Sequence, residues 1–328
     1  MPPSAELIWQ LNQQELLNLL NLGALTQKKQ IRFYAPSFTY YKNSPFLSSP
    51  NVFPTISVTG NSCALNCKHC GGKVLATMQP AVTPEKLFEL CSKLKRDGAV
   101  GCLISGGCLP DGSVPLKPFA GAIARVKREL GLTVFVHTGI VDLDTAVFLK
   151  QSGVNAALID ILGSQETIEK VYGLKVTVQN YVDSLFALQN SGLPFVPHLI
   201  VGLKDGKLEG EFAALQMISK VNPSAVVIIA FMPLHGTEMA NVEPPQPHDI
   251  ARVTASARVM FPQTPLALGC MRPKGKHRAT TDVLALKAGV DAVAFPSQGA
   301  IDFVKRQGWT VLFSPYCCAQ VFVDSAKG

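Results

Sequence analysis

Three cysteines in one short stretch constrain this chain more than any other feature. Cys63, Cys67 and Cys70 lie four and three residues apart, directly after a run at 54–60 that is typical of a strand. A loop of this length can turn three thiolates toward one point. A four-iron, four-sulfur cube held by three cysteines keeps one iron without a protein ligand, where a small molecule can bind. The spacing therefore predicts an iron–sulfur cluster with one open coordination site.

A zinc site or a chance grouping is the alternative interpretation. Structural zinc usually has four ligands arranged in pairs such as C-x2-C. Only Cys67 and Cys70 form such a pair, so Cys63 and His69 would have to supply the other two ligands. We therefore expect iron rather than zinc.

Composition limits the class of protein. The 328 residues are 47% hydrophobic, which is enough to bury a large core. No apolar run reaches the length of a membrane span, and the first residues lack the pattern of a secretory signal. Nine cysteines without an export signal indicate metal binding or reactive thiols in a reducing compartment, so we expect a cytoplasmic protein. The net charge of +7 comes without a lysine tract, which argues against nucleic acid and suits acidic protein partners.

A regular alternation of short apolar runs and helical stretches predicts the fold. Strands that are apolar on both faces and separated by helices pair in parallel. The eight runs lie near residues 54–60, 100–105, 133–137, 155–161, 195–201, 224–231, 265–270 and 290–295. We therefore predict an α/β fold, a (β/α)8 TIM-like barrel over residues 55–328 that ends in a short cysteine-containing tail. A further strand at 310–313 has no place in this scheme.

Residues 1–54 are predicted to form an N-terminal extension. Residues 4–23 are typical of one helix, with Ser4 as the N-cap and Gly23 at its end. Residues 28–54 are predicted to be an irregular lead-in that covers one end of the barrel. Its aromatic residues either line a site or pack as an extension, and they are Phe33, Tyr34, Phe38, Tyr40 and Tyr41.

The cysteine loop after a first strand resembles the signature of the radical S-adenosylmethionine (radical SAM) enzymes. In that family the open iron takes the amino and carboxylate groups of the cofactor. From Phe33 to Cys318 the chain also resembles biotin synthase-related members, and most closely one subunit of the two-component lipoyl synthases. The stretches that carry this likeness are Gly60 to Gly72, Ser105 to Gly112, Val171 to Gly173, Gly269 to Pro273 and Cys317-Cys318. The resemblance implies S-adenosylmethionine and a 4Fe-4S cluster as cofactors.

The C-terminal ends of barrel strands carry the site in this architecture, so the residues there are candidates for binding the cofactor. They are Ser105, Gly106, Gly107, His137, Asp160, His198, Gly202 and Pro233. His137 could bond the cofactor, the substrate or only neighbouring backbone, and Asp160 could accept a hydrogen bond from a ribose hydroxyl. The resemblance implies that residues 198–202 and the turn at 233–237 support the adenine. Radical SAM enzymes often have a carboxylate where this chain has Cys108, so a thiol replaces that contact at the barrel mouth.

The other cysteines fall into two groups. Cys91 lies on the apolar face of a predicted helix and Cys102 lies inside a predicted strand, so both are expected in the core. The remaining four either form a second cluster or are free thiols or a redox-active pair, and they are Cys108, Cys270, Cys317 and Cys318. The resemblance to biotin synthase adds Arg272 as a possible further ligand.

The resemblance also implies the chemistry. Reductive cleavage of the cofactor gives methionine and a 5′-deoxyadenosyl radical, which removes hydrogen from an unactivated carbon. In sulfur insertion the second cluster gives up a sulfide, so we expect a sulfurtransferase of the lipoyl synthase type. The implied partners are an octanoylated carrier protein or lipoyl domain, a second radical SAM subunit and a low-potential electron donor. The basic stretch 272–278 either docks an acidic carrier or forms a solvated loop.

Two other functions are consistent with these residues. One is a different radical SAM reaction on a small molecule, such as a methylation or rearrangement in the biosynthesis of a cofactor. The other is a non-catalytic iron–sulfur or zinc protein for electron transfer or redox sensing. Reductive cleavage of S-adenosylmethionine separates the enzymes from the non-catalytic protein.

Overall fold

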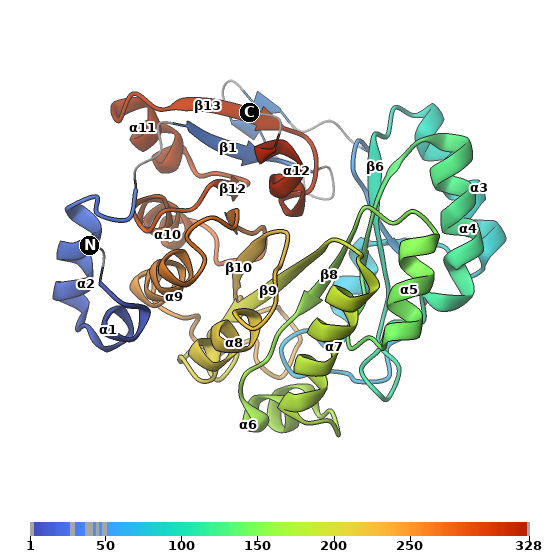
Figure 1. Ribbon diagram of the computed structural model, residues 1–328, viewed down its shortest axis with the longest axis horizontal. Helices are drawn as coiled ribbons and strands as arrows, with labels where there is room; N and C mark the ends of the chain where they lie inside the picture. The colour runs from blue at the N-terminus through green and yellow to red at the C-terminus, as the bar shows by residue number, and fades with distance from the viewer. Residues whose placement is uncertain (1–2, 27–29, 37–41, 44–45, 48–50, 327–328) are drawn as a thin grey trace.

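One parallel sheet of eleven strands organises the computed structural model, which describes residues 3–26, 30–36, 42–43, 46–47 and 51–326. The sheet is strongly curved, and most of the helices lie along its outer side (Figure 1). Its strands, in spatial order, are β13 (Thr310–Ser314), β1 (Gln30–Tyr34), β12 (Ala292–Ala294), β11 (Leu266–Leu268), β10 (Val226–Ala230), β9 (Phe195–Val201), β8 (Ala156–Asp160), β7 (Thr133–His137), β6 (Gly101–Ser105), β4 (Thr55–Ser57) and β5 (Gln79–Pro80). A separate antiparallel pair consists of β2 (Lys42–Asn43) and β3 (Phe46–Leu47).

Twelve α-helices and five shorter helical segments complete the described part of the chain. The α-helices are α1 (Ala5–Gln10), α2 (Gln13–Asn21), α3 (Pro84–Arg96), α4 (Ala120–Arg125), α5 (Leu143–Gln151), α6 (Gln165–Thr167), α7 (Val178–Ser191), α8 (Glu211–Ile218), α9 (Pro247–Met260), α10 (Lys276–Lys287), α11 (Gln298–Arg306) and α12 (Val321–Ser325). The shorter segments are η1 (Lys73–Thr77), η2 (Lys117–Phe119), η3 (Val126–Leu130), η4 (Ile168–Tyr172) and η5 (Cys318–Gln320). No helix among the described residues is both long and apolar enough to cross a membrane.

The predicted α/β barrel-like fold is confirmed. All eight apolar runs are strands, and neighbouring strands of the large sheet pair in parallel. Helix α3 begins at Pro84, where Thr83 accepts a hydrogen bond from the Lys86 backbone and Pro84 occupies the first turn. Within the described residues the sheet is open between its two edge strands, β5 and β13.

Strand β1 corrects the prediction of an irregular lead-in. Gln30–Tyr34 pairs with β12 on one side and with β13 on the other, which also gives the unplaced strand at 310–313 its position. Phe33 and Tyr34 are fully buried, so these aromatic residues pack in the core. Phe38, Tyr40 and Tyr41 lie outside the described residues. The division of the chain at residue 54 remains a prediction.

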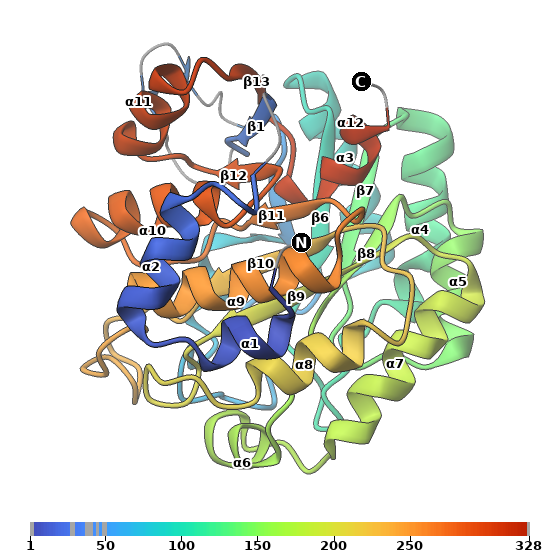
Figure 2. The same ribbon diagram turned by 60° about the vertical axis from the view of Figure 1, so that its left-hand side comes forward.

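The N-terminal segment forms two helices where one was predicted. Ser4 caps α1 as expected. Asn12 then starts α2 with a capping box, because its side chain accepts from the Glu15 backbone and the Glu15 carboxylate accepts from the Asn12 backbone. This reciprocal pair stabilises a new helix start and so breaks the single helix. Figure 2 shows α1 and α2 lying against α9.

The two faces of the sheet bury different sets of side chains. The outward residues of the strands pack against the helices in one large apolar cluster. The inward residues include many alanines, such as Ala156, Ala267 and Ala294, and the C-terminal tail packs against them. The tail is held in place because Tyr34 and Arg32 both donate hydrogen bonds to Asp324. Small side chains on the inner face therefore leave room for the tail inside the curved sheet.

A fully buried ion pair fixes the loop after β11. Arg272 donates to Asp282 Oδ1 over 2.8 Å, and neither side chain is exposed. Arg272 also donates to the carbonyls of Gly269 and Phe295, while Asp282 Oδ2 accepts from the Ser297 backbone over 2.8 Å. The pair therefore joins the ends of β11 and β12 to α10.

Replacing Asp282 with Ala will destabilise the apoprotein by about 3–5 kcal/mol, because it leaves a buried guanidinium without a counter-charge. Urea unfolding followed by circular dichroism measures the change. The control is Asp183→Ala, which removes an exposed carboxylate from α7 and will change stability by less than about 0.5 kcal/mol. Equal stabilities of the two variants would show that the buried pair has no such role.

Candidate active site

The cysteine loop runs across the C-terminal ends of the strands. It leaves β4 and is joined by backbone hydrogen bonds to three other loops of the mouth. Ala64 donates to the carbonyl of Cys108 over 2.9 Å, and Lys68 donates to that of Val171 over 2.9 Å. Met239 donates to the carbonyl of Lys68 over 3.3 Å. The loop is therefore held by the segments that follow β6, β8 and β10.

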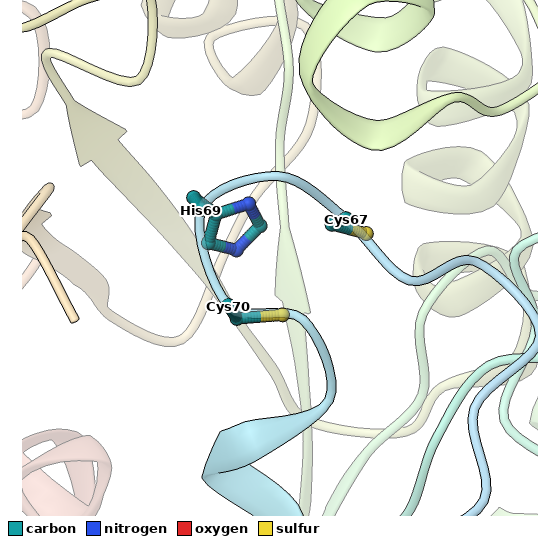
Figure 3. Close-up of side chains that lie close together, drawn as sticks. All are labelled: Cys67, His69 and Cys70. Carbon is teal, nitrogen blue, oxygen red and sulfur yellow. The ribbon is translucent and has the colours of Figure 1, made fainter. Parts of the chain in front are cut away.

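Cys67, His69 and Cys70 converge within this loop. Their ligand atoms all lie within 4.8 Å of one another, and Figure 3 shows the three side chains close together on one turn of the loop. Hydrogen bonds from Cys67 and His69 hold the pKa of Cys70 well below its usual range, while the same bond and burial raise the pKa of Cys67. A thiolate is the form that binds metal, so the loop already favours a ligand at Cys70. Cys63 is half-buried nearby and acts on the pKa of Cys67.

Glycine is required where the loop after β6 passes the cysteine loop. A Cβ atom on Gly107 would lie 2.0 Å from the carbonyl oxygen of Ser62 and 2.6 Å from Cβ of Cys63. Gly106 is close to Thr59, whose hydroxyl accepts from the Gly107 backbone over 2.7 Å. The backbone of these two glycines therefore approaches the cysteine loop closely.

His137, Asp160 and His198 form a polar group beside the loop. His137 Nε2 lies 3.4 Å from Asp160 Oδ1, and the two imidazole rings are 5.8 Å apart. Burial lowers the pKa of His137, but the neighbouring Asp160 outweighs burial and the net shift is upward. Burial raises the pKa of Asp160, but His137 and other imidazoles lower it overall. Burial lowers the pKa of His198 to about 4, so its ring is neutral near pH 7.

The remaining strand-end residues are held by backbone contacts. Ser105 donates to the carbonyl of His137 over 3.1 Å. Gly202 has a positive φ of 78° and donates to the buried carboxylate of Glu211 over 2.8 Å. Pro233 precedes a turn in which Thr237 donates to Leu234. These residues shape the mouth through the backbone, and their contact with a cofactor remains a prediction.

Several buried polar atoms at the mouth have no hydrogen-bond partner in the described structure. They include His69 Nδ1 and the Tyr172 hydroxyl, while Asp160 Oδ1 has only the 3.4 Å contact with His137. The rings of His69 and Tyr172 are 4.9 Å apart. Buried polar groups are normally satisfied, so this set fits a bound polar ligand. Our sequence analysis missed Glu211 and the tyrosines Tyr172 and Tyr181, although Tyr172 lies in the quoted stretch 171–173.

The tail thiols form a second group inside the sheet. Cys317 and Cys318 are buried against the inner face of β10, β11 and β12, and Cys270 packs against the same apolar cluster. A hydrogen bond links the two tail thiols, which lowers the pKa of Cys317 and raises that of Cys318. His137 also acts on Cys317, so this group lies beside the polar residues of the mouth.

Cys108 lies with the cysteine loop. Burial raises its pKa to about 12, and Cys63, Asp160 and Cys70 add to the rise. Cys91 and Cys102 are fully buried next to each other, which confirms their place in the core.

The basic stretch after β11 is mostly turned inward. Arg272 is fully buried, and all three of its guanidinium nitrogens donate to protein oxygens. Arg278 donates to the carbonyl of Arg272 over 2.9 Å, and His277 lies 2.8 Å from that of Pro245. Only Lys274 and Lys276 of the five basic residues in this described stretch are exposed.

Comparisons with known proteins agree with this geometry. Residues 57–211 match the family model of the radical SAM superfamily. A biotin synthase from Prochlorococcus marinus is 25% identical over 73% of this chain and 73% of its own length. One from Neorickettsia sennetsu is 24% identical over 88% of this chain and 86% of its own. Among solved structures, methylornithine synthase aligns with a TM-score of 0.61 at 16% identity, covering 94% of this chain and 93% of that one. The FeFe-hydrogenase maturase HydG from Carboxydothermus hydrogenoformans aligns with a TM-score of 0.64 at 14% identity, covering 97% of this chain and 76% of that one.

The match over residues 57–211 and the cysteine loop at the strand ends define a radical SAM iron–sulfur enzyme. Residues 57–211 carry the radical SAM domain, and the chain is similar to the biotin synthases over most of its length. The residues at the mouth fit the cofactors of this family, because Cys67 and Cys70 converge with His69 near unpartnered polar atoms, and Cys63 lies in the same loop. Cys63, Cys67 and Cys70 would hold the cluster, which together with S-adenosylmethionine supplies radical chemistry at unactivated carbon.

Replacing Asp160 with Asn will lower the pKa of His137 below its usual value, because burial will then act on the imidazole without an opposing carboxylate. In the native chain the ion pair between His137 and Asp160 stabilises the fold at pH values above the lowered pKa of Asp160. That contribution is lost as the pH rises through the raised pKa of His137. NMR titration of the histidine rings in the metal-free protein measures the change.

The control for this titration is Asp249→Asn. It removes the carboxylate 3.6 Å from Nε2 of His248 and will leave the titration of His137 unchanged. An unaltered His137 pKa in the Asp160 variant would show that the pair does not set the charge of the mouth.

Proposed function

We propose that this enzyme inserts sulfur at an unactivated carbon, and that the thiols of the C-terminal tail bind the iron–sulfur cluster that supplies the sulfur. The observation that carries the proposal is the position of the tail. Cys317 and Cys318 fold back into the inside of the curved sheet, where they share an apolar cluster with Cys270. The relationship to biotin synthases supports the same class of reaction.

A metal cluster explains why three thiols share this interior. Ionised thiolates are costly to bury unless another charge compensates them, and iron provides that charge. The guanidinium nitrogens of Arg272 donate to Asp282 and to two carbonyls, so the proposed site does not need Arg272 as a ligand. Its positive charge lies close to Cys270 and Cys318. The tail thiols therefore fit a site separate from the cysteine loop, and His137 interacts electrostatically with Cys317 of the tail.

The chain's own residues enclose the reaction. The loop after β4 covers the strand ends. The tail fills the inside of the sheet, close to the polar pair of His137 and Asp160. An enclosed site keeps water away from reactive intermediates and orients the substrate carbon.

We further propose that the chain is one subunit of a two-component lipoyl synthase. Its substrate is then an octanoyl group on a lysine of a small carrier protein or lipoyl domain, and a second radical SAM subunit adds the other sulfur. A low-potential electron donor supplies the reducing equivalent. Lys274 and Lys276 support contact with an acidic carrier, because they are exposed beside the loop that follows Cys270. Buried Arg272 takes no part in that contact.

Replacing Cys63, Cys67 and Cys70 together with Ala will remove about four iron atoms per chain from the anaerobically reconstituted protein and leave about four at the tail. Adding Cys270→Ala, Cys317→Ala and Cys318→Ala will remove the rest. Iron and sulfide analysis measures both steps. Cys91→Ala is the control, since this thiol belongs to the outer core and will keep the full iron content. Full iron in the first variant would contradict the loop site, and no iron would contradict the tail site.

Cys270→Ala will abolish sulfur insertion but keep reductive cleavage of S-adenosylmethionine, because it removes a ligand of the sulfur source and leaves the loop intact. The wild-type chain is reconstituted with isotope-labelled sulfide and offered an octanoylated lipoyl domain with dithionite. Mass spectrometry detects label in the octanoyl chain, and chromatography detects 5′-deoxyadenosine.

The two readouts separate the alternatives. Cofactor cleavage without label in any product would favour another radical SAM reaction on a small molecule. No cleavage with a fully loaded loop cluster would favour a protein of electron transfer or redox sensing. Label in the product of the Cys270→Ala variant would contradict the tail site as the sulfur source.

A further inference from the structure

A fourth cysteine is fixed against the three-cysteine loop by two backbone contacts. The amide of Ala64, next to Cys63, donates to the carbonyl of Cys108 over 2.9 Å. On the other side of Cys108, the backbone of Gly107 lies so close that an added Cβ would be 2.6 Å from Cβ of Cys63. Cys108 therefore follows Gly107 along a segment that is packed directly on the first cysteine of the loop.

The surroundings of Cys108 separate it from the tail thiols. The charged groups that act most strongly on it are Cys63, Asp160 and Cys70. The tail thiols Cys317 and Cys318 interact with each other and with Cys270 and Arg272 instead. Cys108 is half-buried and follows the C-terminal end of β6, where its carbonyl accepts from the Ala64 amide of the loop.

The three-cysteine loop leaves one iron of its cluster without a protein ligand. We propose that Cys108 is an exchangeable fourth ligand of this cluster, which occupies the open iron before S-adenosylmethionine arrives and leaves it when the cofactor binds. The inference rests on the loop cluster alone, so it stands or falls independently of sulfur insertion.

The exchange is balanced without an oxidant or reductant. The bond between iron and the Cys108 sulfur breaks, and the released thiolate takes up a proton from solvent. The amino and carboxylate groups of the cofactor form new bonds to the same iron, and no electron moves. Before the cofactor binds, a fourth thiolate closes the cluster and protects it from oxygen and chelators.

Such a ligand competes with the cofactor. If the closed form makes up about nine-tenths of the molecules, the apparent Kd for S-adenosylmethionine is raised about tenfold over that of the open form. A fourth anionic sulfur also makes the cluster harder to reduce, so its midpoint potential is more negative in the closed form. Both effects disappear when the cofactor saturates the site.

The test uses the anaerobically reconstituted full chain with Cys108→Ala and, separately, Cys108→Ser, which keeps the size of the side chain. Each is made with the tail intact and with Cys270, Cys317 and Cys318 replaced by Ala, so that the loop cluster gives the only iron–sulfur signal. We expect Cys108→Ala to bind S-adenosylmethionine about tenfold more tightly than the parent chain. We also expect a less negative midpoint potential without cofactor and equal potentials with saturating cofactor. Redox titration and electron paramagnetic resonance of the reduced cluster measure these quantities.

Cys91→Ala is the matched control, because this thiol lies in the outer core, and it will change neither quantity. Equal affinity and equal potential in the parent and Cys108 variants would overturn the proposal. Weaker cofactor binding by Cys108→Ala would also overturn it, since the thiol would then be a contact to the cofactor. If Cys108→Ala does not assemble a cluster, the result with Cys108→Ser decides, and a parent-like spectrum in that variant overturns the proposal. Absence of loop iron in the parent chain would remove the cluster itself and the inference with it.

Discussion

Parallel pairing of every strand in the large sheet is the constraint on which the site depends. Because the strands run the same way, all of their C-terminal ends meet at one edge, and the loops that follow them are neighbours. Residues as distant in sequence as Cys63, Cys108 and Asp160 come together for this reason. The close contact at Gly107 then sets how near two of those loops can approach, since a single added carbon would collide with Cys63.

Much of the fold and the core of the site could be predicted from local patterns. The eight apolar runs are strands. A short segment that is apolar on both faces and lies between amphipathic helices is typical of a buried parallel strand. Cys63, Cys67 and Cys70 are so close in sequence that they lie in one loop, and this could be predicted without knowing the rest of the fold. These features need only residues that are close in sequence.

The features that sequence analysis missed depend on residues far apart. Gln30–Tyr34 is a strand because β12 and β13 pair with it on either side. The residues near position 30 do not by themselves predict this pairing with strands far along the chain. The basic stretch after β11 looked like a docking surface, but Asp282 draws Arg272 inside. The break before α2 is different, because the sequence contains its local signal, the Asn12–Glu15 capping box. The leucine pattern continues across this break, and it led to the prediction of a single helix.

Openness of the sheet explains why the tail can take part in the site. A closed eight-stranded barrel fills its interior with its own side chains. Here the inner face carries alanines, and the residues of the tail occupy the space instead, anchored by Asp324 to Tyr34 and Arg32. The ring of Tyr316 reaches Phe53, just before β4, with ring centres 5.7 Å apart. The tail thus contacts β1 and the residue before β4, the strands next to the two edges of the open sheet, and a movement of its thiols would act on both of them.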